Sequence, residues 1–473
     1  MSVLSKFSLL ACQKGLLREA AVDEGLAPQD TVQYLQNLNC DRIGALQLRK
    51  GLTLLGSQIS SGNAILGMAN YRDNAGATYR MLAKVNTEVY AYNGTSWSSV
   101  RSGLTSNSKA SFTNFIDLTY MVNGNGNEAL QTYNGTTFGV SNVGSLPTGD
   151  FVENFRSRIW VADNSTDKLY YSNVVSTSQT ITGGASYIQI SPQDGEKITG
   201  LKRNPDALLV FKQNHIYRVL STNSADPDPA ILLGTYSNDS IVEGKDGIYY
   251  HHPTGFYKYP QTDISRPIID IIQAIPRSYY ENVVGWFDDN SYYWSIGDIT
   301  LEGVSLTNIV CRWTVSTQVW TVYSYGSEIR SAGLYDDGTN LFPLVGDNDG
   351  NVLKFNSGTT DNGSPIHYDL ITHWYYFTST KSTVKTISEI GTLHENAQGA
   401  SLSYQLDTDQ QSKWRPIGQI TKDLYQVNKL NAVSFTRIRF RLSGNSVGSP
   451  FIFRGWEILS SLTDGEIKKY LSK

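Results

Sequence analysis

The sequence of 473 residues is poor in charged residues, in cysteine and in long apolar runs. Charged residues make up only 17% of the chain, the formal net charge is −4 and no basic block stands out, which argues against a protein built for strong phosphate binding. The three cysteines, Cys12, Cys40 and Cys311, are odd in number and widely spaced, so they match neither a metal-ligand pattern nor a disulfide framework. We expect free thiols in a chain that folds in a reducing cytoplasm.

Segments that direct a chain to a membrane are also missing. The apolar patch at 7–11 is followed at once by Lys14, Arg18 and Glu19, and it is too short for the hydrophobic region of a signal peptide. No stretch approaches the roughly 18 apolar residues that a membrane-spanning helix needs. We therefore expect a protein that is neither secreted by a signal peptide nor inserted into a bilayer.

What the sequence has instead is aromatic residues, glycine and a repeated phrase. It contains 29 Tyr, 16 Phe, 9 Trp and 41 Gly, a mixture typical of β-structure. Tyr-Asn-Gly-Thr-Ser-Trp at 92–97 returns as Tyr-Asn-Gly-Thr-Thr-Phe at 133–138. Each copy predicts two strands joined by Asn-Gly, which supplies the positive φ angles of a type I′ turn. A period of about 40 to 50 residues, with several short strands in each, is typical of a β-propeller.

The repeat extends over most of the chain. Short strands such as 207–211 and 216–219 alternate with turn residues, and closing the sheets into a ring would protect their edges. We expect about seven blades. They cover 64–104, 109–149, 151–192, 197–238, 240–275, 282–325 and 328–357.

The predicted fold class is all-β: a propeller of about seven blades, a small C-terminal β-sandwich and an extended N-terminal arm. In the arm, Val32, Leu35 and Leu38 lie three residues apart and predict one short helical turn. The arm then either completes a blade or lies on a neighbouring subunit. The expected parts are the arm (1–61), the propeller (62–358), a linker (359–365), the sandwich (366–462) and a tail (463–473).

Motifs for catalysis or metal binding are weak. The run 444–448 matches G-x-S-x-G, but a strand follows it where a nucleophile elbow needs a helix, so a hairpin loop is favoured. Asp347 and Asp349 resemble the start of a calcium loop, but the downstream glutamate is missing; a blade turn is favoured and a calcium ion is the alternative. His251 and His252 are adjacent, so on a strand they point to opposite faces. We predict no enzymatic activity, catalytic residue, resident metal or cofactor.

Two patterns keep a glycan-related alternative open. Paired carboxylates could form a glycosidase dyad, although each pair lies in a turn that favours aspartate for its own reasons. Paired tyrosines could stack on sugars, although packing between blades explains them more simply. The carboxylate pairs are Asp288/Asp289, Asp336/Asp337 and Asp407/Asp409, and the tyrosine pairs are Tyr249/Tyr250, Tyr292/Tyr293 and Tyr375/Tyr376.

The strongest basic feature is a row of arginines near the C-terminus. Arg437, Arg439 and Arg441 alternate with apolar residues and therefore share one face of a strand. This face either meets DNA phosphates or an acidic partner surface, or is a solvated face of the sandwich. The arm adds three further candidate interaction residues, Arg42, Arg49 and Lys50.

Three stretches of the chain resemble one family. They are 39–51 in the arm, 195–218 in the middle of the propeller and 240–259 after it. In these stretches the sequence resembles the tail hub, or nozzle, proteins of short-tailed bacteriophages, also called packaged-DNA stabilisation proteins. The resemblance covers most of the chain in pattern, and no catalytic motif anchors it.

The resemblance implies a structural protein of the virion tail that is made in the host cytoplasm. It implies a hexameric ring below the portal and adaptor proteins that extends the DNA channel, retains the packaged genome and anchors fibres, spikes or a needle. Genomic DNA would pass through the channel without sequence-specific contact. The alternative is a glycan-binding or glycan-cleaving propeller, such as a receptor-binding protein or a lectin.

Overall fold

The computed structural model describes residues 4–10, 14–18, 30–42, 44–124, 128–140, 148–174, 186–222, 225–227, 232–376, 384–409, 413–446 and 451–462. Regular structure in these ranges is nearly all β-strand, and the one α-helix among them, α1 (Ile269–Gln273), has five residues. No helix in these ranges is long and apolar enough to cross a lipid bilayer. The all-β prediction is confirmed.

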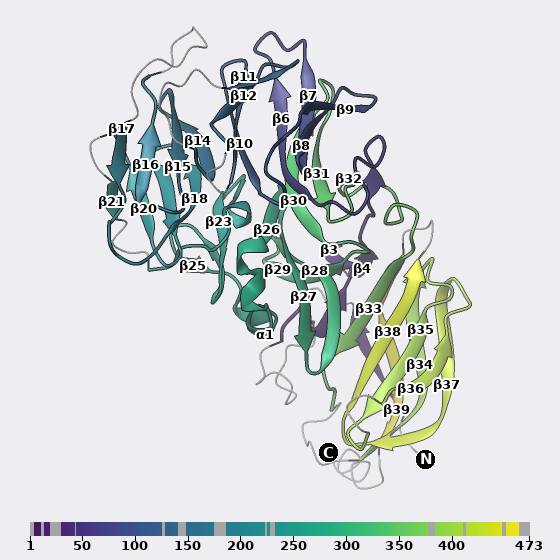
Figure 1. Ribbon diagram of the computed structural model, residues 1–473. Coiled ribbons are helices and arrows are strands. Elements are labelled where there is room, and N and C mark those ends of the chain that lie inside the picture. Colours follow the sequence, from purple (N-terminus) through teal and green to yellow (C-terminus); the bar gives the residue numbers. More distant parts are fainter. Residues whose placement is uncertain are drawn as a thin grey trace.

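Seven groups of four strands form the propeller at the upper left of Figure 1. Blade 1 contains β6 (Ile65–Arg72), β7 (Tyr79–Val85), β8 (Glu88–Tyr92) and β9 (Trp97–Arg101); blade 2 contains β10 (Ala110–Phe115), β11 (Leu118–Asn123), β12 (Gln131–Tyr133) and β13 (Phe138–Val140). Blade 3 contains β14 (Phe151–Phe155), β15 (Arg158–Ala162), β16 (Lys168–Tyr171) and β17 (Ser186–Gln189); blade 4 contains β18 (Ile198–Arg203), β19 (Leu208–Lys212), β20 (Ile216–Val219) and β21 (Ala225–Pro227).

The remaining three blades complete the ring. Blade 5 contains β22 (Val242–Gly244), β23 (Gly247–His252), β24 (Gly255–Lys258) and β25 (Thr262–Asp263); blade 6 contains β26 (Val284–Asp288), β27 (Ser291–Leu301), β28 (Val304–Thr314) and β29 (Val319–Ser324). Blade 7 contains β30 (Ile329–Asp336), β31 (Leu341–Asp347), β32 (Val352–Lys354) and, from the N-terminal segment, β5 (Thr53–Leu54). Apart from β5, every blade strand lies within one of the seven segments expected from the sequence, and the first strand of blade 7 contacts that of blade 1.

The repeated phrase forms a turn that differs from the expected one. Gly94 and Gly135 have φ angles of +97° and +93°, but the asparagines before them do not have positive φ, so the turns are not type I′. The Asn93 side-chain oxygen instead accepts hydrogen bonds from the backbone N–H groups of Thr95 and Ser96, both at 2.9 Å. The Asn-Gly prediction placed the hairpins correctly, and the asparagine acts through its side chain.

Two sheets form the C-terminal sandwich at the lower right of Figure 1. The first continues blade 6: its order after β29 is β2 (Val32–Gln36), β33 (Ile366–Thr372), β38 (Ile438–Ser446), β35 (Ser401–Leu406) and β36 (Arg415–Gln419). The second has the order β3 (Leu38–Arg42), β4 (Ala45–Leu48), β39 (Ile452–Leu462), β34 (Lys385–Glu395) and β37 (Leu424–Phe435), and β1 (Leu4–Leu10) also pairs with β39. The predicted sandwich is confirmed.

The expected helical turn after Asp30 is wrong, because β2 is a strand. The pairing register between β2 and β33 shifts between Val32 and Tyr34, which marks a β-bulge. The extra residue places Val32 and Leu35 in the same core, and both are fully buried. A bulged strand therefore produced the three-residue spacing that a helix would also give.

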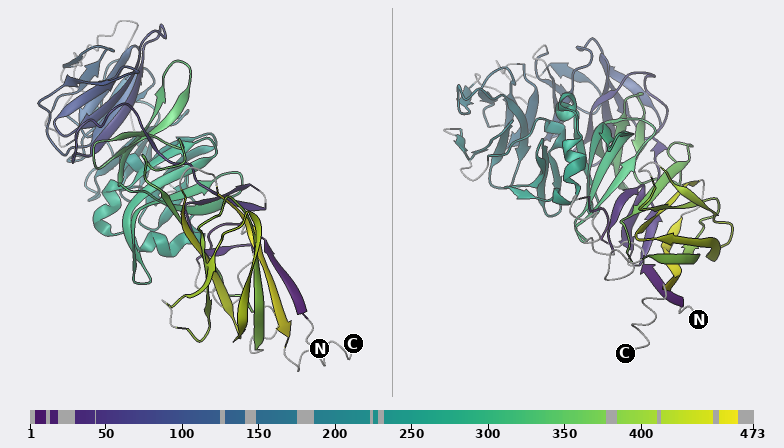
Figure 2. Two further views of the ribbon diagram at one scale, coloured as in Figure 1. Left: turned by 90° about the vertical axis from the view of Figure 1, so that its right-hand side faces the viewer. Right: turned by 90° about the horizontal axis from the view of Figure 1, so that it is seen from below.

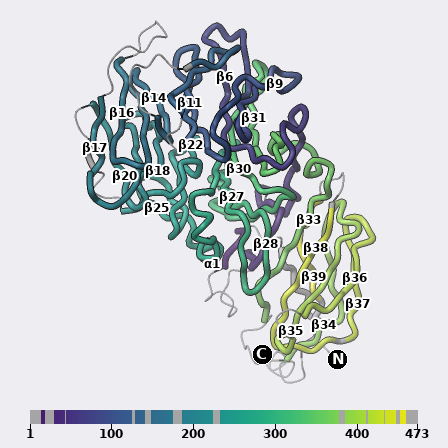
Figure 3. Tube along the Cα trace, viewed as in Figure 1, coloured from purple at the N-terminus to yellow at the C-terminus, as the bar shows by residue number. Residues whose placement is uncertain are grey.

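The propeller and the sandwich are joined by one sheet and one core. Strand β2 pairs with β29 of blade 6 on one side and with β33 of the sandwich on the other. Trp294 and Trp320 of blade 6 belong to the same buried apolar cluster as Phe440 and Trp456 of the sandwich. Figure 2 shows the two parts as one elongated body, and Figure 3 traces the N-terminal chain to the region where they meet.

The N-terminal segment takes part in both halves of the molecule. Besides closing blade 7 through β5, it supplies β1 to β4 to the sandwich sheets. The expected linker contacts the N-terminal segment, because Asp361 forms a β-bridge with Leu52. The domain limits drawn from the sequence stay a prediction, and the tail at 463–473 lies outside the described residues.

Candidate functional site

The C-terminal arginine row is stacked with two tryptophans. The Arg437 guanidinium lies 4.5 Å from the ring centre of Trp374, and that of Arg439 lies 4.7 Å from the same ring. Arg439 also lies 5.3 Å from the ring of Trp414, and Arg441 lies 5.8 Å from it. These five residues form an alternating cation–π stack, which we call the arginine–tryptophan ladder.

Polar partners within the fold hold the ladder arginines. Arg441 donates from Nε and Nη2 to the two carboxylate oxygens of Asp369, each at 2.8 Å. The Nε of Arg439 donates to Oε1 of Gln405 at 2.7 Å, and the residue is only 7% exposed. Burial removes Arg439 from the candidates for contact with an outside phosphate or protein, whereas Arg437 and Arg441 stay half-exposed.

The prediction that Arg49 is an interaction residue is also wrong, because Arg49 is buried and binds groups within the fold. Its side chain is fully buried and forms a bidentate ion pair with Asp361 at 2.8 and 2.5 Å. It also donates to the side-chain oxygen of Asn37 at 2.7 Å and to the Ser324 carbonyl at 2.9 Å, and it lies 4.1 Å from the ring centre of Tyr325. Arg49 thus fastens the N-terminal segment, blade 6 and residues 358–365 to one another. The other two candidates in the arm, Arg42 and Lys50, are exposed.

A groove of about 630 Å³ runs beside the ladder, between the sandwich and the far end of the β27–β28 hairpin. We call it the ladder groove. Apolar side chains dominate its hairpin side, where Val304 is 59% exposed. The buried Arg439 and the half-exposed Arg441 line its other side, so the groove combines apolar surface with one accessible guanidinium, that of Arg441. Its further lining residues include Tyr34, Leu301, Leu306, Ile371 and Trp414.

A second cavity of about 330 Å³ lies where all seven blades meet, and we call it the axial cavity. Lys109, from the loop before blade 2, reaches across to the loops before blades 5 and 6. Its Nζ lies 2.8 Å from Oδ2 of Asp239 and donates to the Glu281 carbonyl at 2.9 Å. The propeller axis is therefore crossed by a side chain. One residue from each blade or from the loop before it lines the cavity: Leu66, Lys109, Phe151, Lys197, Tyr236, Glu281 and Arg330.

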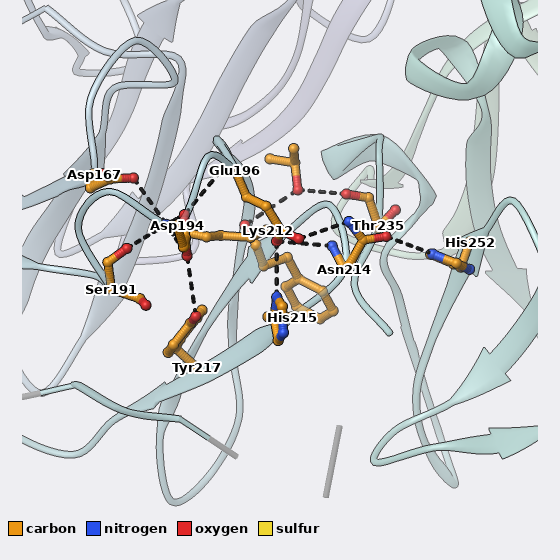
Figure 4. Close-up of polar contacts among 12 residues, drawn as sticks. Asp167, Ser191, Asp194, Glu196, Lys212, Asn214, His215, Tyr217, Thr235 and His252 are labelled. Atoms are coloured by element: carbon orange, nitrogen blue, oxygen red, sulfur yellow. Dashed lines mark hydrogen bonds and ion pairs between the residues drawn. The ribbon is translucent and has the colours of Figure 1, made fainter. Parts of the chain in front are cut away.

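A buried lysine joins blades 3 and 4 (Figure 4). The fully buried Lys212 donates to the carboxylates of Asp167 at 2.9 Å and Asp194 at 2.7 Å, and to the Ser191 carbonyl at 3.2 Å. Burial alone would raise the pKa of Asp194, but the hydrogen bond from Lys212 and further donors outweigh it, and the pKa is lowered. Sequence analysis missed this cluster; a lysine that ends the apolar run at 208–212 was the available signal.

The candidate calcium residues serve a turn. Asp347 accepts hydrogen bonds through Oδ1 from the backbone N–H groups of Asp349 at 3.0 Å and Asn351 at 2.8 Å, and through Oδ2 from the Asn351 side chain. This arrangement is the blade turn that the sequence favoured. Within the described ranges, no group of three or more His, Cys, Asp or Glu residues is placed to hold a metal ion.

The histidine pair and the carboxylate pairs serve structural roles. Burial lowers the pKa of His251 to about 3 and that of His252 to about 4, so both rings are neutral at pH 7. Asp337 accepts the backbone N–H groups of Thr339 and Asn340 at 2.9 and 2.7 Å, as expected for turns. Asp409 pairs with Arg415, and Asp288 accepts a hydrogen bond from Asn356.

Aromatic packing accounts for the pairs Tyr249/Tyr250 and Tyr292/Tyr293. Tyr249 and Tyr292 pack ring against ring across blades 5 and 6 with centres 4.0 Å apart, and Tyr250 packs against Phe211 of blade 4 at 5.5 Å. Tyr293 stacks on Trp286 at 5.4 Å within blade 6. In the G-x-S-x-G run, 444–446 belongs to strand β38, and 447–448 lies outside the described residues.

Comparison with known proteins gives likeness in structure only. The sequence matches no protein-family model and no curated protein. Among solved structures, YCF48 from Cyanidioschyzon merolae is 12% identical with a TM-score of 0.41, and the match covers 63% of this chain and 98% of that one. BamB from Moraxella catarrhalis is 10% identical with a TM-score of 0.38, over 75% of this chain and 97% of that one. The computationally designed Ika8 protein is 9% identical with a TM-score of 0.38, over 64% and 99%.

Proposed function

We propose that this chain is a structural protein of a short-tailed bacteriophage virion: a hexameric tail hub, or nozzle, below the portal and adaptor. In this role it extends the DNA channel, retains the packaged genome and anchors fibres, spikes or a needle. The observation that carries the proposal is the continuous sheet from blade 6 through β2 into the sandwich. This sheet makes the propeller and the sandwich one body.

The continuity of the sheet matters because a hub transmits force between its attachments. Domains joined by a flexible linker move independently by default. Here, the shared sheet, the common apolar core and the buried Arg49–Asp361 pair all oppose such motion.

In the proposed hub the DNA channel runs between copies rather than through one propeller. The axis of the single propeller is crossed by Lys109 and encloses only about 330 Å³. A ring of copies with net charge −4 each would present a weakly repulsive wall along which DNA slides. The ladder groove is the candidate surface for contact with a neighbouring copy or tail protein.

Electron microscopy of the purified chain tests the proposal, alone and after mixing with candidate portal–adaptor complexes. We expect a six-fold ring with an axial channel, free or docked on the adaptor. The substitution Val304→Asp in the ladder groove should weaken ring formation, whereas Lys245→Ala at an exposed ion pair should not. Monomers that never join any portal–adaptor complex would contradict the proposal.

A further inference from the structure

The axial cavity has the size and position of a ligand site that the hub role does not use. Its volume of about 330 Å³ lies at the low end of the range for small-molecule pockets, roughly 300–1,000 Å³. The side chains of Lys109 and Asp239 that cross it are 30% and 32% exposed, so solvent reaches them. A small polar molecule therefore has access to the groups that meet at the axis.

Charges in the cavity wall are balanced. Three basic side chains face three carboxylates, so neither an anion nor a cation finds a site of opposite sign. Side-chain amides add both hydrogen-bond donors and acceptors, which is what a set of hydroxyl groups requires. The basic residues are Lys109, Lys197 and Arg330, the acidic ones Asp150, Asp239 and Glu281, and the amides include Asn107, Asn164 and Gln213.

Tyr236 lines the cavity, and its ring is held in place by its neighbours. Tyr236 packs edge-on against Tyr280, with ring centres 5.7 Å apart and an angle of 67° between the rings. The ring of His252 lies 6.3 Å from it on another side. A ring fixed in this way offers an apolar face at low entropic cost, beside polar groups that fix orientation.

We infer that the axial cavity binds an uncharged saccharide of one or two rings. The amides and the charged pairs hydrogen-bond the hydroxyl groups, and the apolar face of the sugar stacks on Tyr236. Binding is non-covalent, and no side chain needs to change its protonation state. The inference is independent of the hub proposal, since a hexameric hub and a monomer would present the same cavity.

Ligand-observed NMR and calorimetry on the full chain test this inference. The probes are glucose, galactose, rhamnose, N-acetylglucosamine, maltose and lactose. We expect saturable binding of at least one sugar with a dissociation constant of about 1 mM, because the site is small and open. Tyr236→Ala should weaken that binding at least tenfold, and Tyr236→Phe, which keeps the ring, should retain it.

Two further variants keep the test decisive if Tyr236→Ala fails to fold. Gln213→Leu removes an amide from the cavity wall in the turn between β19 and β20 and should also weaken binding several-fold. Lys245→Ala, outside the cavity, should leave it unchanged. Absence of saturable binding by every probe at about 10 mM would overturn the inference. Binding that Tyr236→Ala and Gln213→Leu leave intact would overturn it too, whatever electron microscopy shows about the ring.

Discussion

Replacing Arg49 by methionine should destabilise the chain more than any surface substitution. The change removes a guanidinium whose side chain is fully buried while leaving Asp361, only 11% exposed, without its partner. It also removes the hydrogen bonds that Arg49 donates to the Asn37 side-chain oxygen and to the Ser324 carbonyl, and it ends the stacking on Tyr325. Methionine has similar length, so the loss is mainly electrostatic.

The magnitude follows from the burial of the ion pair. Breaking a buried pair by removing one partner costs about 3–5 kcal/mol, because the remaining charge stays desolvated. The exposed pair between Lys245 and Asp289, with side chains 73% and 86% exposed, is the matched comparison. Lys245→Met should change the free energy of unfolding by no more than about 0.5 kcal/mol.

Urea unfolding followed by tryptophan fluorescence measures both variants. The shared sheet and the common apolar core remain in Arg49→Met, so the propeller and the sandwich should still unfold together, at a lower urea concentration. The double variant Arg49→Met/Asp361→Leu should recover part of the loss, since it removes the unpaired carboxylate. A loss below about 1 kcal/mol in Arg49→Met would refute the assigned role of this residue.

Three further predictions concern separate parts of the molecule. Trp374→Ala removes the ring between Arg437 and Arg439 and should lower the free energy of chemical unfolding by about 2 kcal/mol. Trp374→Phe, which keeps an aromatic ring, should lower it less. Equal losses in the two variants would contradict the arginine–tryptophan ladder. Leu55→Pro removes the donor of the hydrogen bond from the Leu55 N–H to the Val352 carbonyl and should open the edge of blade 7. Light scattering should show aggregation of this variant and far less aggregation of Leu55→Ala. Equal aggregation of the two variants would argue against closure of blade 7 by the N-terminal strand. The pKa of His251 is about 3 in the folded chain and 6.5 in the unfolded chain, so the unfolded chain binds more protons between these two pH values. The free energy of unfolding therefore falls as the pH drops from 6.5 to about 3, by up to about 1.4 kcal/mol per pH unit. His251→Phe should make this acid dependence shallower in unfolding measured at a series of pH values, and an unchanged slope would contradict the assignment.

Local signals in the sequence sufficed for the blades but not for the way they are joined. The turn residues and the period of the repeat are local, and every blade strand except β5 lies within its expected segment. The bulge in β2 was hidden, because its three-residue spacing also fits a helix. Strand β5 has only two residues, too few to carry a pattern, and its partner β32 lies about 300 residues away.

For the candidate site, too, local features could be predicted from the sequence but contacts between distant segments could not. The alternation correctly placed Arg439 and Arg441 on one strand, β38, whereas Arg437 lies in the bend just before it. Trp374 and Trp414, which stack on that face, come from distant segments, and nothing local marks them as partners. For the same reason the burial of Arg49 could not be predicted, since Asp361 and Tyr325 approach it only in the folded chain. The axial cavity draws on all seven blades, and no single motif encodes it.

Closure of blade 7 by β5 has a consequence for synthesis of the chain. The strand that completes the ring leaves the ribosome before every other strand of the seven blades, yet Leu54 pairs with Leu353. Strand β1 can pair only later still, after β39 has been synthesised, because Leu4 pairs with Ser461. Contacts of such sequence separation make folding slow and leave strand edges exposed in the meantime. The nascent chain thus carries an open ring until its C-terminal third emerges, and assembly with other proteins before that point would join an unfinished subunit.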